Sequence, residues 1–274
     1  MSHIMRTVEK KVLSVEQAEG KGARVRRSIG RKELRHLDPF LLLDEFIIRR
    51  PGGFPEHPHR GFETVTYLTK GSIRHEDSQG NACTIHKGDL QWLTNGKGVI
   101  HSEMPATDGE AHGLQLWVNL PAAKKMIEPA YQGLSASQIP TASVVGTTVK
   151  VIAGESMGIS SPVRTHTPTY YLIFEMDPGS KFTQYLPEDW NAFIYILAGT
   201  IGIGDYDDLV ESEAHHTLVL SKGVAVRILN IGIEKAHFVL IAGQPIGEPV
   251  VQQGPFVMNT QGEIKQAIKD FYPR

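Results

Sequence analysis

Short runs of alternating or continuous hydrophobic residues, separated by glycine or proline, recur about every ten residues along most of the chain. This spacing is typical of the strands of an all-β sandwich or barrel, and stretches with helical periodicity are scarce. The clearest strand candidates are residues 64–68, 113–118, 170–174 and 237–241. We therefore predict an all-β fold.

The last segment of the chain differs, because its hydrophobic residues recur with the period of a helix. Four of them share one predicted face: Ile264, Ala267, Ile268 and Phe271. Thr260 and Glu263 have the spacing of a capping box at the start of this helix. The segment predicts a short C-terminal helix that packs on the sheets.

The second half of the chain repeats short motifs of the first half in the same order. Residues 69–73, 87–88 and 111–112 match residues 197–201, 222–223 and 236–237. Such a repeat predicts two similar β domains. We assign them to residues 5–130 and 131–274, and we expect the linker within residues 124–149, where prolines and small polar residues gather.

Composition and charge exclude several classes of protein. Lys and Arg number 28 and Asp and Glu number 30, so the formal net charge is −2, and no global charge favours nucleic acid or an anionic membrane. The chain has one cysteine, Cys83, so it can form no internal disulfide. We find no apolar run long enough for a membrane span and no signal-peptide pattern. We expect an intracellular monomer, in nucleus and cytoplasm in a eukaryote or in the cytoplasm of a bacterium.

Two pairs of metal-binding side chains share the same spacing: His57 with His59, and His101 with Glu103. In an extended strand, residues i and i+2 point to the same side. If each pair lies on a strand and both strands face one cavity, three imidazoles and a carboxylate converge, as a divalent transition metal requires. A single pair would be typical of a solvated proline-rich loop, but the second pair favours a metal site in the first domain.

Parity alone cannot choose between Glu63 and Glu103 as the fourth ligand. In an unbroken strand, Glu63 would point to the same side as His57 and His59. Extending the repeat backwards without gaps places Tyr185 and Pro187 opposite the two histidines, so we expect the second domain to lack a metal site. No cysteine accompanies the ligands, which argues against a zinc-thiolate site. We expect iron(II), with manganese, copper, nickel and zinc as alternatives, and positions left open for oxygen or substrate.

The chain also resembles a known family, the pirins of the cupin superfamily. The resemblance is carried by residues 24–30, 37–40, 51–64, 88–92, 101–105, 111–120 and 254–260, and it covers nearly the whole chain. It implies two tandem cupin barrels of jelly-roll type, with iron in the N-terminal barrel. It further implies that His57, His59, His101 and Glu103 are the ligands, so that Glu63 becomes a residue beside them.

The resemblance implies an enzyme, a quercetin 2,3-dioxygenase that cleaves the ring of flavonols with dioxygen. Glu103 is then the catalytic residue, because a carboxylate at the metal can accept the proton of a flavonol hydroxyl. Gln115 and Trp117 lie on a strand that can line the first barrel, although core packing explains Trp117 equally well. We expect Phe54, Met104 and Leu116 to add apolar cavity wall.

An alternative from a different class is a non-catalytic co-regulator that binds transcription factors according to the redox state of its iron. The resemblance implies this role too. Its contact surface would be the local basic cluster that includes Arg24, Arg26, Arg27 and Arg31, although such clusters are usually solvated faces. A third interpretation is another cupin activity, because fold and metal alone do not fix a reaction.

Overall fold

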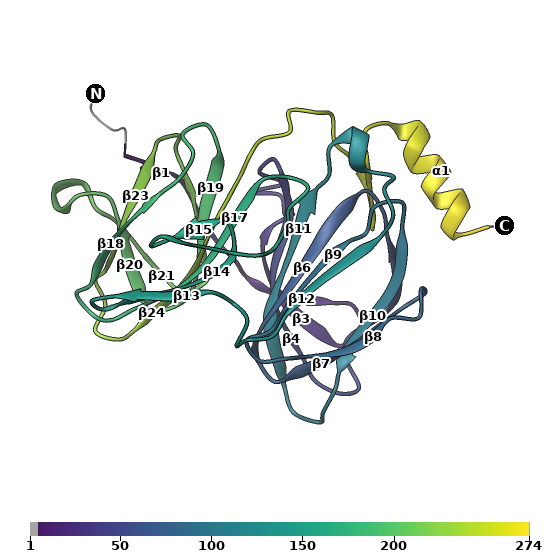
Figure 1. Ribbon diagram of the computed structural model, residues 1–274, viewed down its shortest axis with the longest axis horizontal. Helices are drawn as coiled ribbons and strands as arrows, with labels where there is room; N and C mark the ends of the chain where they lie inside the picture. The colour runs from purple at the N-terminus through teal and green to yellow at the C-terminus, as the bar shows by residue number, and fades with distance from the viewer. Residues whose placement is uncertain (1–4, 274) are drawn as a thin grey trace. The chain divides into compact units, whose positions relative to one another are not determined.

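Two β-barrel units make up the chain in the computed structural model, which describes residues 5–273 (Figure 1). The first barrel unit comprises residues 16–30, 38–136 and 246–273, and the second comprises residues 5–15, 31–37 and 137–245. The sequence-based division at 130/131 follows the order of the chain. In the structure, by contrast, each end of the chain belongs to the unit built mainly from the other half. Arg274, the last residue of the predicted second domain, lies outside the described residues.

The first barrel unit consists of a seven-stranded and a four-stranded antiparallel sheet. The larger sheet has the order β12 (Ala130–Leu134), β9 (Leu90–Thr94), β6 (Phe62–Lys70), β11 (Ala111–Asn119), β4 (Phe40–Ile48), β3 (Ala23–Ile29) and β2 (Glu16–Glu19). The smaller sheet has the order β5 (Phe54–His59), β10 (Val99–Pro105), β7 (Ser72–Asp77) and β8 (Ala82–His86). Ile73 and Ile85 of the smaller sheet pack with Phe46 and Leu68 of the larger one. The sheets therefore enclose a common interior.

The second barrel unit repeats this arrangement. Its larger sheet has the order β1 (Val8–Leu13), β22 (His216–Leu220), β19 (Asn191–Ala198), β24 (Ala236–Gly243), β17 (Thr169–Met176), β14 (Thr147–Ala153) and β13 (Thr141–Val144). Its smaller sheet has the order β18 (Lys181–Tyr185), β23 (Ala225–Asn230), β20 (Thr200–Ile203) and β21 (Val210–Glu213). The remaining elements are β15 (Glu155–Ser156), β16 (Ile159–Ser160), β25 (Val251–Gln253), β26 (Phe256–Met258), the 3-10 turns η1 (Ala122–Lys124) and η2 (Tyr206–Asp208), and helix α1 (Gln261–Phe271).

The internal repeat has a structural cause at two of its glycines. Gly71 has φ +72° between β6 and β7, and Gly199 has φ +81° between β19 and β20. A Cβ on Gly71 would lie 2.4 Å from the carbonyl oxygen of Glu110, and one on Gly199 would lie 2.8 Å from Cα of Ala236. Each glycine thus lets a tight turn approach the start of the strand that follows in the sheet. All four predicted strands are present, and so are the two barrels.

The predicted linker at residues 124–149 contains the passage from the first barrel unit to the second, between residues 136 and 137, but much of it forms strands. Residues 130–134 form β12, which pairs with β9, and residues 141–144 form β13, which pairs with β14. Between these two strands only residues 135–140 remain as a connection. Of the small polar residues that suggested a linker, Ser135 and Ser137 lie at exposed positions of this connection, and Thr141 and Ser143 lie at exposed positions of β13.

The predicted C-terminal helix is confirmed as α1. Its capping box is complete, because Thr260 Oγ1 accepts the N–H of Glu263 at 3.2 Å and Glu263 Oε2 accepts the N–H of Thr260 at 2.8 Å. Ile264 and Ala267 are buried against Phe256 and Met258 of β26. We call residues 246–273 the C-terminal arm; it belongs to the first barrel unit.

The C-terminal arm is fastened to the turns that flank β5 and β10. The Arg60 guanidinium donates to Asp270 at 2.7 Å and to the carbonyl of Lys97 at 2.5 Å, and it lies over the ring of Phe271. Buried Lys125 donates to the carbonyls of Gly61 at 2.8 Å and Val257 at 3.0 Å. These contacts fix the turn after β5 and the turn before β10.

Close approach makes the turn after β5 dependent on one glycine. Gly61 has φ +91°, and a Cβ there would lie 1.9 Å from the carbonyl oxygen of Val257. Only glycine leaves room for the C-terminal arm at this point. Because this turn interrupts the alternation of side chains, a residue of β6 cannot be assigned to a face by counting from β5.

The N-terminal segment is held in the second barrel unit by one arginine. Arg6 is fully buried, and its guanidinium donates to the backbone carbonyls of Pro187, Glu188, Trp190, Ser221 and Gly223. Charge-assisted bonds to carbonyl oxygens satisfy the donors without a carboxylate. The segment around Arg6 is therefore an integral part of this unit.

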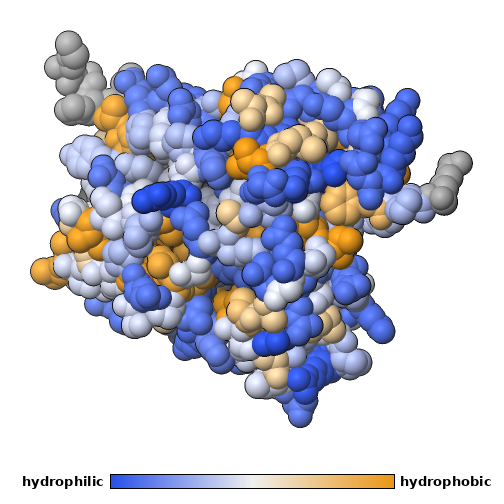
Figure 2. Space-filling view, turned by 45° about the vertical axis from the view of Figure 1, so that its right-hand side comes forward, coloured by the Kyte–Doolittle hydropathy of each residue, from blue (hydrophilic) through white to orange (hydrophobic). Residues whose placement is uncertain are grey.

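The visible surface carries no broad apolar face. Figure 2 shows hydrophobic residues in small groups separated by hydrophilic ones. Groups of this kind are normal on folded proteins. In the part of the chain that the structure describes, no helix is long and apolar enough to cross a membrane.

Replacing Lys125 by methionine tests the fastening of the C-terminal arm. The substitution preserves most of the side-chain length but leaves three acceptors, the carbonyls of Gly61 and Val257 and Oδ1 of Asn119, without their donor. We expect the free energy of unfolding to fall by about 2–4 kcal/mol, measured by urea denaturation. Lys265→Met, on the exposed side of α1, is the matched control and should cost little. An unchanged urea midpoint in Lys125→Met would contradict the proposed fastening.

Candidate metal centre

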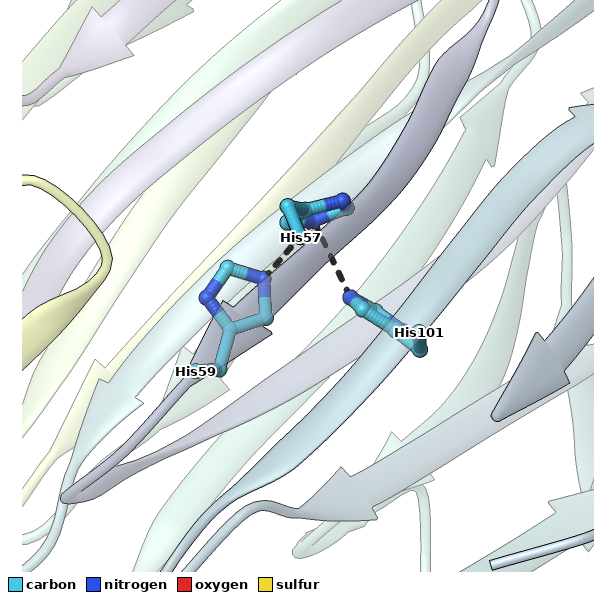
Figure 3. A group of neighbouring side chains, drawn as sticks. All are labelled: His57, His59 and His101. Carbon is cyan, nitrogen blue, oxygen red and sulfur yellow. Dashed lines mark hydrogen bonds between the residues drawn. The ribbon is translucent and has the colours of Figure 1, made fainter. Parts of the chain in front are cut away.

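Strand pairing brings the two histidine-bearing segments together. β5 and β10 are antiparallel neighbours, and His57 lies opposite His101 in their register. His59 is two residues from His57, so both imidazoles extend from the same face of β5. Figure 3 shows the rings of His57 and His59 on one strand and that of His101 on its neighbour, turned toward one another. The predicted convergence of three imidazoles is present.

The three rings place their Nε2 atoms at distances that suit one metal ion. Nε2 of His57 lies 3.1 Å from Nε2 of His59 and 3.1 Å from Nε2 of His101. Two nitrogens bound about 2.0–2.1 Å from a common ion lie roughly 2.9–3.4 Å apart. Among residues 5–273, these histidines are the group of three potential metal-binding side chains whose ligand atoms lie within 4.8 Å of one another. The donor set therefore fits a divalent transition metal.

Burial keeps the three imidazoles neutral, as metal binding requires. Burial lowers the pKa of His57 and lowers the pKa of His59 and His101 well below the usual range, with further lowering from the neighbouring histidines. Nδ1 of His57 lies 2.7 Å from the carbonyl of Pro55 and can only donate there, which assigns the ring proton to Nδ1. Nε2 of His57 consequently offers a lone pair to the centre of the group.

Glu103 lies in the same interior but outside the histidine group. Its side chain is buried, and each carboxylate oxygen has a donor: Thr66 Oγ1 at 3.0 Å and Gln115 Nε2 at 2.9 Å. Burial raises the pKa of Glu103 to about 7, although the hydrogen bonds from Thr66 and Gln115 lower it. Glu103 shares the inward face of β10 with His101, which places an acid of near-neutral pKa beside the three imidazoles.

Glu63 lies on the wrong face for a ligand. β6 is regular between Glu63 and Thr66, so the two side chains point to opposite faces, and it is Thr66 that contacts Glu103. The turn at Arg60 and Gly61 breaks the parity on which the sequence argument relied. Glu63 instead accepts a hydrogen bond from Thr94 at 2.7 Å, and burial raises its pKa to about 7.

Aromatic side chains flank one side of the histidines. Phe62 and Trp117 stack with ring centroids 4.4 Å apart, and each lies 5.0 Å from the ring of His59. Trp117 is half-buried, whereas Phe62 is fully buried. The expectation that Gln115 and Trp117 line the first barrel is confirmed, and Trp117 offers a flat surface beside the candidate metal position.

The prediction that Phe54, Met104 and Leu116 form an apolar wall of the cavity is largely wrong. Leu116 alternates with Gln115 and Trp117 on β11, so it points to the opposite face of the sheet. Met104 alternates with Glu103 and lines a surface groove with Arg50 and Arg74. Phe54 packs edge-on against Phe46, with ring centroids 6.0 Å apart. Strand parity therefore turns Met104 and Leu116 away from the interior that Glu103 and Gln115 share.

Sequence reasoning missed two residues of this centre, Thr66 and His75. Thr66 holds Glu103, and His75, on β7, is fully buried with its Nε2 atom 3.0 Å from Nδ1 of His101. A signal for His75 existed, because it shares strand parity with the apolar core residue Ile73. A polar residue at a core position of a strand usually has a partner inside the protein.

The basic cluster is neutralised by nearby carboxylates. Arg24 and Arg26 both pair with Glu16, and Arg31 pairs with Glu33 at 2.6 Å. Arg27 pairs with Asp44 at 2.7 Å through a bidentate contact and with Glu19 at 2.8 Å, and these acids raise its pKa. Arg31 also belongs to the second barrel unit, whereas the other three belong to the first. The four arginines do not make up a free basic surface.

Comparison with known proteins identifies relatives over nearly the whole chain. The family model "Pirin" matches residues 22–118, and the model "Pirin C-terminal cupin domain" matches residues 171–273. Human pirin is 58% identical over 261 residues, which are 95% of this chain and 90% of that protein. A pirin-like protein of Solanum lycopersicum is 55% identical over 97% of this chain and 91% of its own length.

Similar solved structures include one whose name states an activity. The crystal structure of a quercetin 2,3-dioxygenase from Acinetobacter baumannii superposes with a TM-score of 0.90 and 34% identity, covering 98% of this chain and 97% of that one. GK1651 from Geobacillus kaustophilus has a TM-score of 0.82 and 37% identity, covering 90% of this chain and 100% of that chain.

Removing one imidazole tests the ligand assignment. We expect His59→Ala to lose bound metal, because two imidazoles cannot complete the set that His57, His59 and His101 form. Elemental analysis after anaerobic purification and dialysis measures metal per chain. His216→Ala, in the second barrel unit, is the control and should keep the wild-type metal content. Full occupancy in His59→Ala would refute the assignment.

The titration of Glu103 can be followed in the metal-free protein by infrared difference spectroscopy between wild type and Glu103→Gln. Because burial raises its pKa to about 7, we expect the carboxyl to remain protonated at pH 6 and to ionise around neutral pH. Thr66→Val should raise the midpoint further, since it removes a hydrogen bond that favours the carboxylate. A midpoint near 4.5, the ordinary value for glutamate, would show that Glu103 is solvated.

Proposed function

We propose a function for this chain, which belongs to the pirin family. In this proposal it is an iron-dependent quercetin 2,3-dioxygenase. Its first barrel unit acts on flavonols and dioxygen. The observation that carries the proposal is the convergence of three imidazoles, two of them buried, in the interior that Glu103 shares on β10. The similarity to a structure named quercetin 2,3-dioxygenase supports the same activity. The second barrel unit has no assigned chemistry in this proposal.

His57, His59 and His101 would hold the metal through Nε2, with Glu103 as the fourth ligand. Because the three imidazoles are neutral, they would leave most of the positive charge on the ion, which when bound would supply a Lewis acid for an electron-rich oxygen donor. Iron(II) is the proposed ion, with manganese, copper, nickel and zinc as alternatives that share these ligands. Elemental analysis of the anaerobically purified protein decides among them.

Glu103 is the proposed base for the flavonol hydroxyl. As a ligand or after detaching from the ion, it would accept this proton, and once detached the burial that raises its pKa to about 7 would favour keeping it. Thr66 and Gln115 hold its two oxygens and so aim the carboxylate into the barrel. Proton transfer from the hydroxyl to a Glu103 oxygen leaves the negative charge on the flavonol oxygen, where the neighbouring metal position stabilises it.

The aromatic pair would orient the substrate. A flavonol is flat and aromatic, and the half-buried ring of Trp117, backed by Phe62, offers a face beside His59. Stacking on this face would align the substrate for reaction and exclude water from one side of it.

The activity is tested by adding quercetin to the iron-loaded protein, first without and then with oxygen, and measuring flavonol loss and carbon monoxide release. We expect Glu103→Gln to lower turnover per bound iron by roughly 10²–10⁴-fold. Glu63→Gln is the matched control, because Glu63 is equally buried with a similar pKa but lies on the opposite face of β6. Turnover no greater than that of free iron would refute the proposal.

The co-regulator alternative stays a hypothesis, and the structure adds nothing in its favour. Its contact residues Arg24, Arg26, Arg27 and Arg31 are paired with carboxylates. A transcription-factor partner would have to displace Glu16 or Glu33 from these pairs. Equal binding of such a partner by ferrous protein, ferric protein and Arg26→Glu would exclude this role.

A further inference from the structure

We propose that His75 is a positioning residue for the metal centre: it accepts the Nδ1–H of His101 and thereby fixes the ring and tautomer that bind the metal. The inference rests on the metal site of the proposed function. It does not depend on the reaction carried out there. It concerns a side chain that touches a candidate ligand and that the proposed reaction does not otherwise use.

Both ring nitrogens of His101 are engaged. Nε2 lies 3.1 Å from Nε2 of His57, on the metal side, and Nδ1 lies 3.0 Å from Nε2 of His75, on the far side. β10 lies between β5, which carries His57, and β7, which carries His75. The His101 ring is therefore held between a ligand and a residue behind it.

His75 is itself held in place. Its side chain has no exposed surface, and the ring of Tyr131 packs against it at 5.6 Å between centroids. Tyr131 is anchored in turn by a hydrogen bond from its hydroxyl to Asp77. Tyr131 thus holds the orientation of the His75 ring, which keeps Nε2 of His75 directed at His101.

A neutral imidazole carries one proton, so the contact between His75 and His101 has two possible directions. If His75 donates, the proton of His101 is on Nε2, which then cannot bind a metal. If His101 donates from Nδ1, its Nε2 lone pair is free. Metal binding therefore selects the arrangement in which His75 accepts and carries its own proton on Nδ1.

The choice of a histidine has a chemical consequence. His57 has a backbone carbonyl behind it, which can only accept, so its tautomer is the same with and without metal. Nε2 of His75 can donate or accept, so it can hydrogen-bond Nδ1 of His101 both with and without a bound metal. It is also neutral, and unlike a carboxylate it adds no negative charge to the ligand. The metal keeps more of its positive charge as a result.

The test uses protein loaded with zinc, which is diamagnetic and takes the same imidazole ligands. ¹⁵N NMR of the ring nitrogens should show the proton of His101 on Nδ1 and an unprotonated Nε2 on His75. Chelator competition should show zinc bound about 10–100-fold more weakly by His75→Leu. His75→Gln, whose amide can accept or donate, should restore most of the affinity, and His86→Leu, at an exposed position of β8, should leave it unchanged.

Equal zinc affinity in wild type and His75→Leu, or a zinc-loaded protein in which His75 donates to His101, would overturn the proposal. If His75→Leu fails to fold, the NMR measurement on the wild type still decides the direction of the bond. The flavonol assay is independent of both measurements. Zinc binding with the expected tautomer but without flavonol turnover in the iron protein would refute the proposed activity and leave the role of His75 intact.

Discussion

The antiparallel pairing of β5 with β10 is the constraint on which the metal centre depends. Its register sets His57 opposite His101, and the alternation of side chains adds His59 on one strand and Glu103 on the other. A shift by one residue would turn each of these side chains to the outside of the barrel. The pairing is stabilised at its edges, by β7 beside β10 and by the C-terminal arm on the adjoining turns. The site is therefore a property of the whole first barrel unit.

Burial acts on the histidines and on Glu103 in opposite ways. It lowers the pKa of His59 and His101, which frees their nitrogens for a metal, and it raises the pKa of Glu103, which keeps a proton available near neutral pH. Both effects follow from the same cost of placing a charge in an apolar interior. A bound cation would reverse this cost for the carboxylate, because the charges would then compensate. The same water-poor interior thus favours neutral imidazoles at His59 and His101 and a carboxyl at Glu103 that can hold a proton near neutral pH.

Much of this arrangement follows from local rules that can be applied to the sequence. The i, i+2 spacing predicts that His57 and His59 share a face, and the capping box of Thr260 and Glu263 predicts where α1 begins. The same parity rule fails for Glu63, because the turn at Gly61 interrupts the strand. His75 lies on another strand and becomes meaningful only through pairing with β10. Long-range pairing of this kind is not encoded in spacing along the chain.

The crossing of the chain ends between the two units has a consequence for synthesis. The first barrel unit contains residues 16–30 near the start of the chain and the C-terminal arm at its end. Val257 supplies one of the acceptors that hold Lys125, and Asp270 holds Arg60 beside His59. A ribosome has therefore made both histidine-bearing strands long before it releases the residues that brace them. Although the two barrels resemble a tandem duplication, they cannot be separated by a single cut in the gene, because each unit takes segments from both parts of the chain.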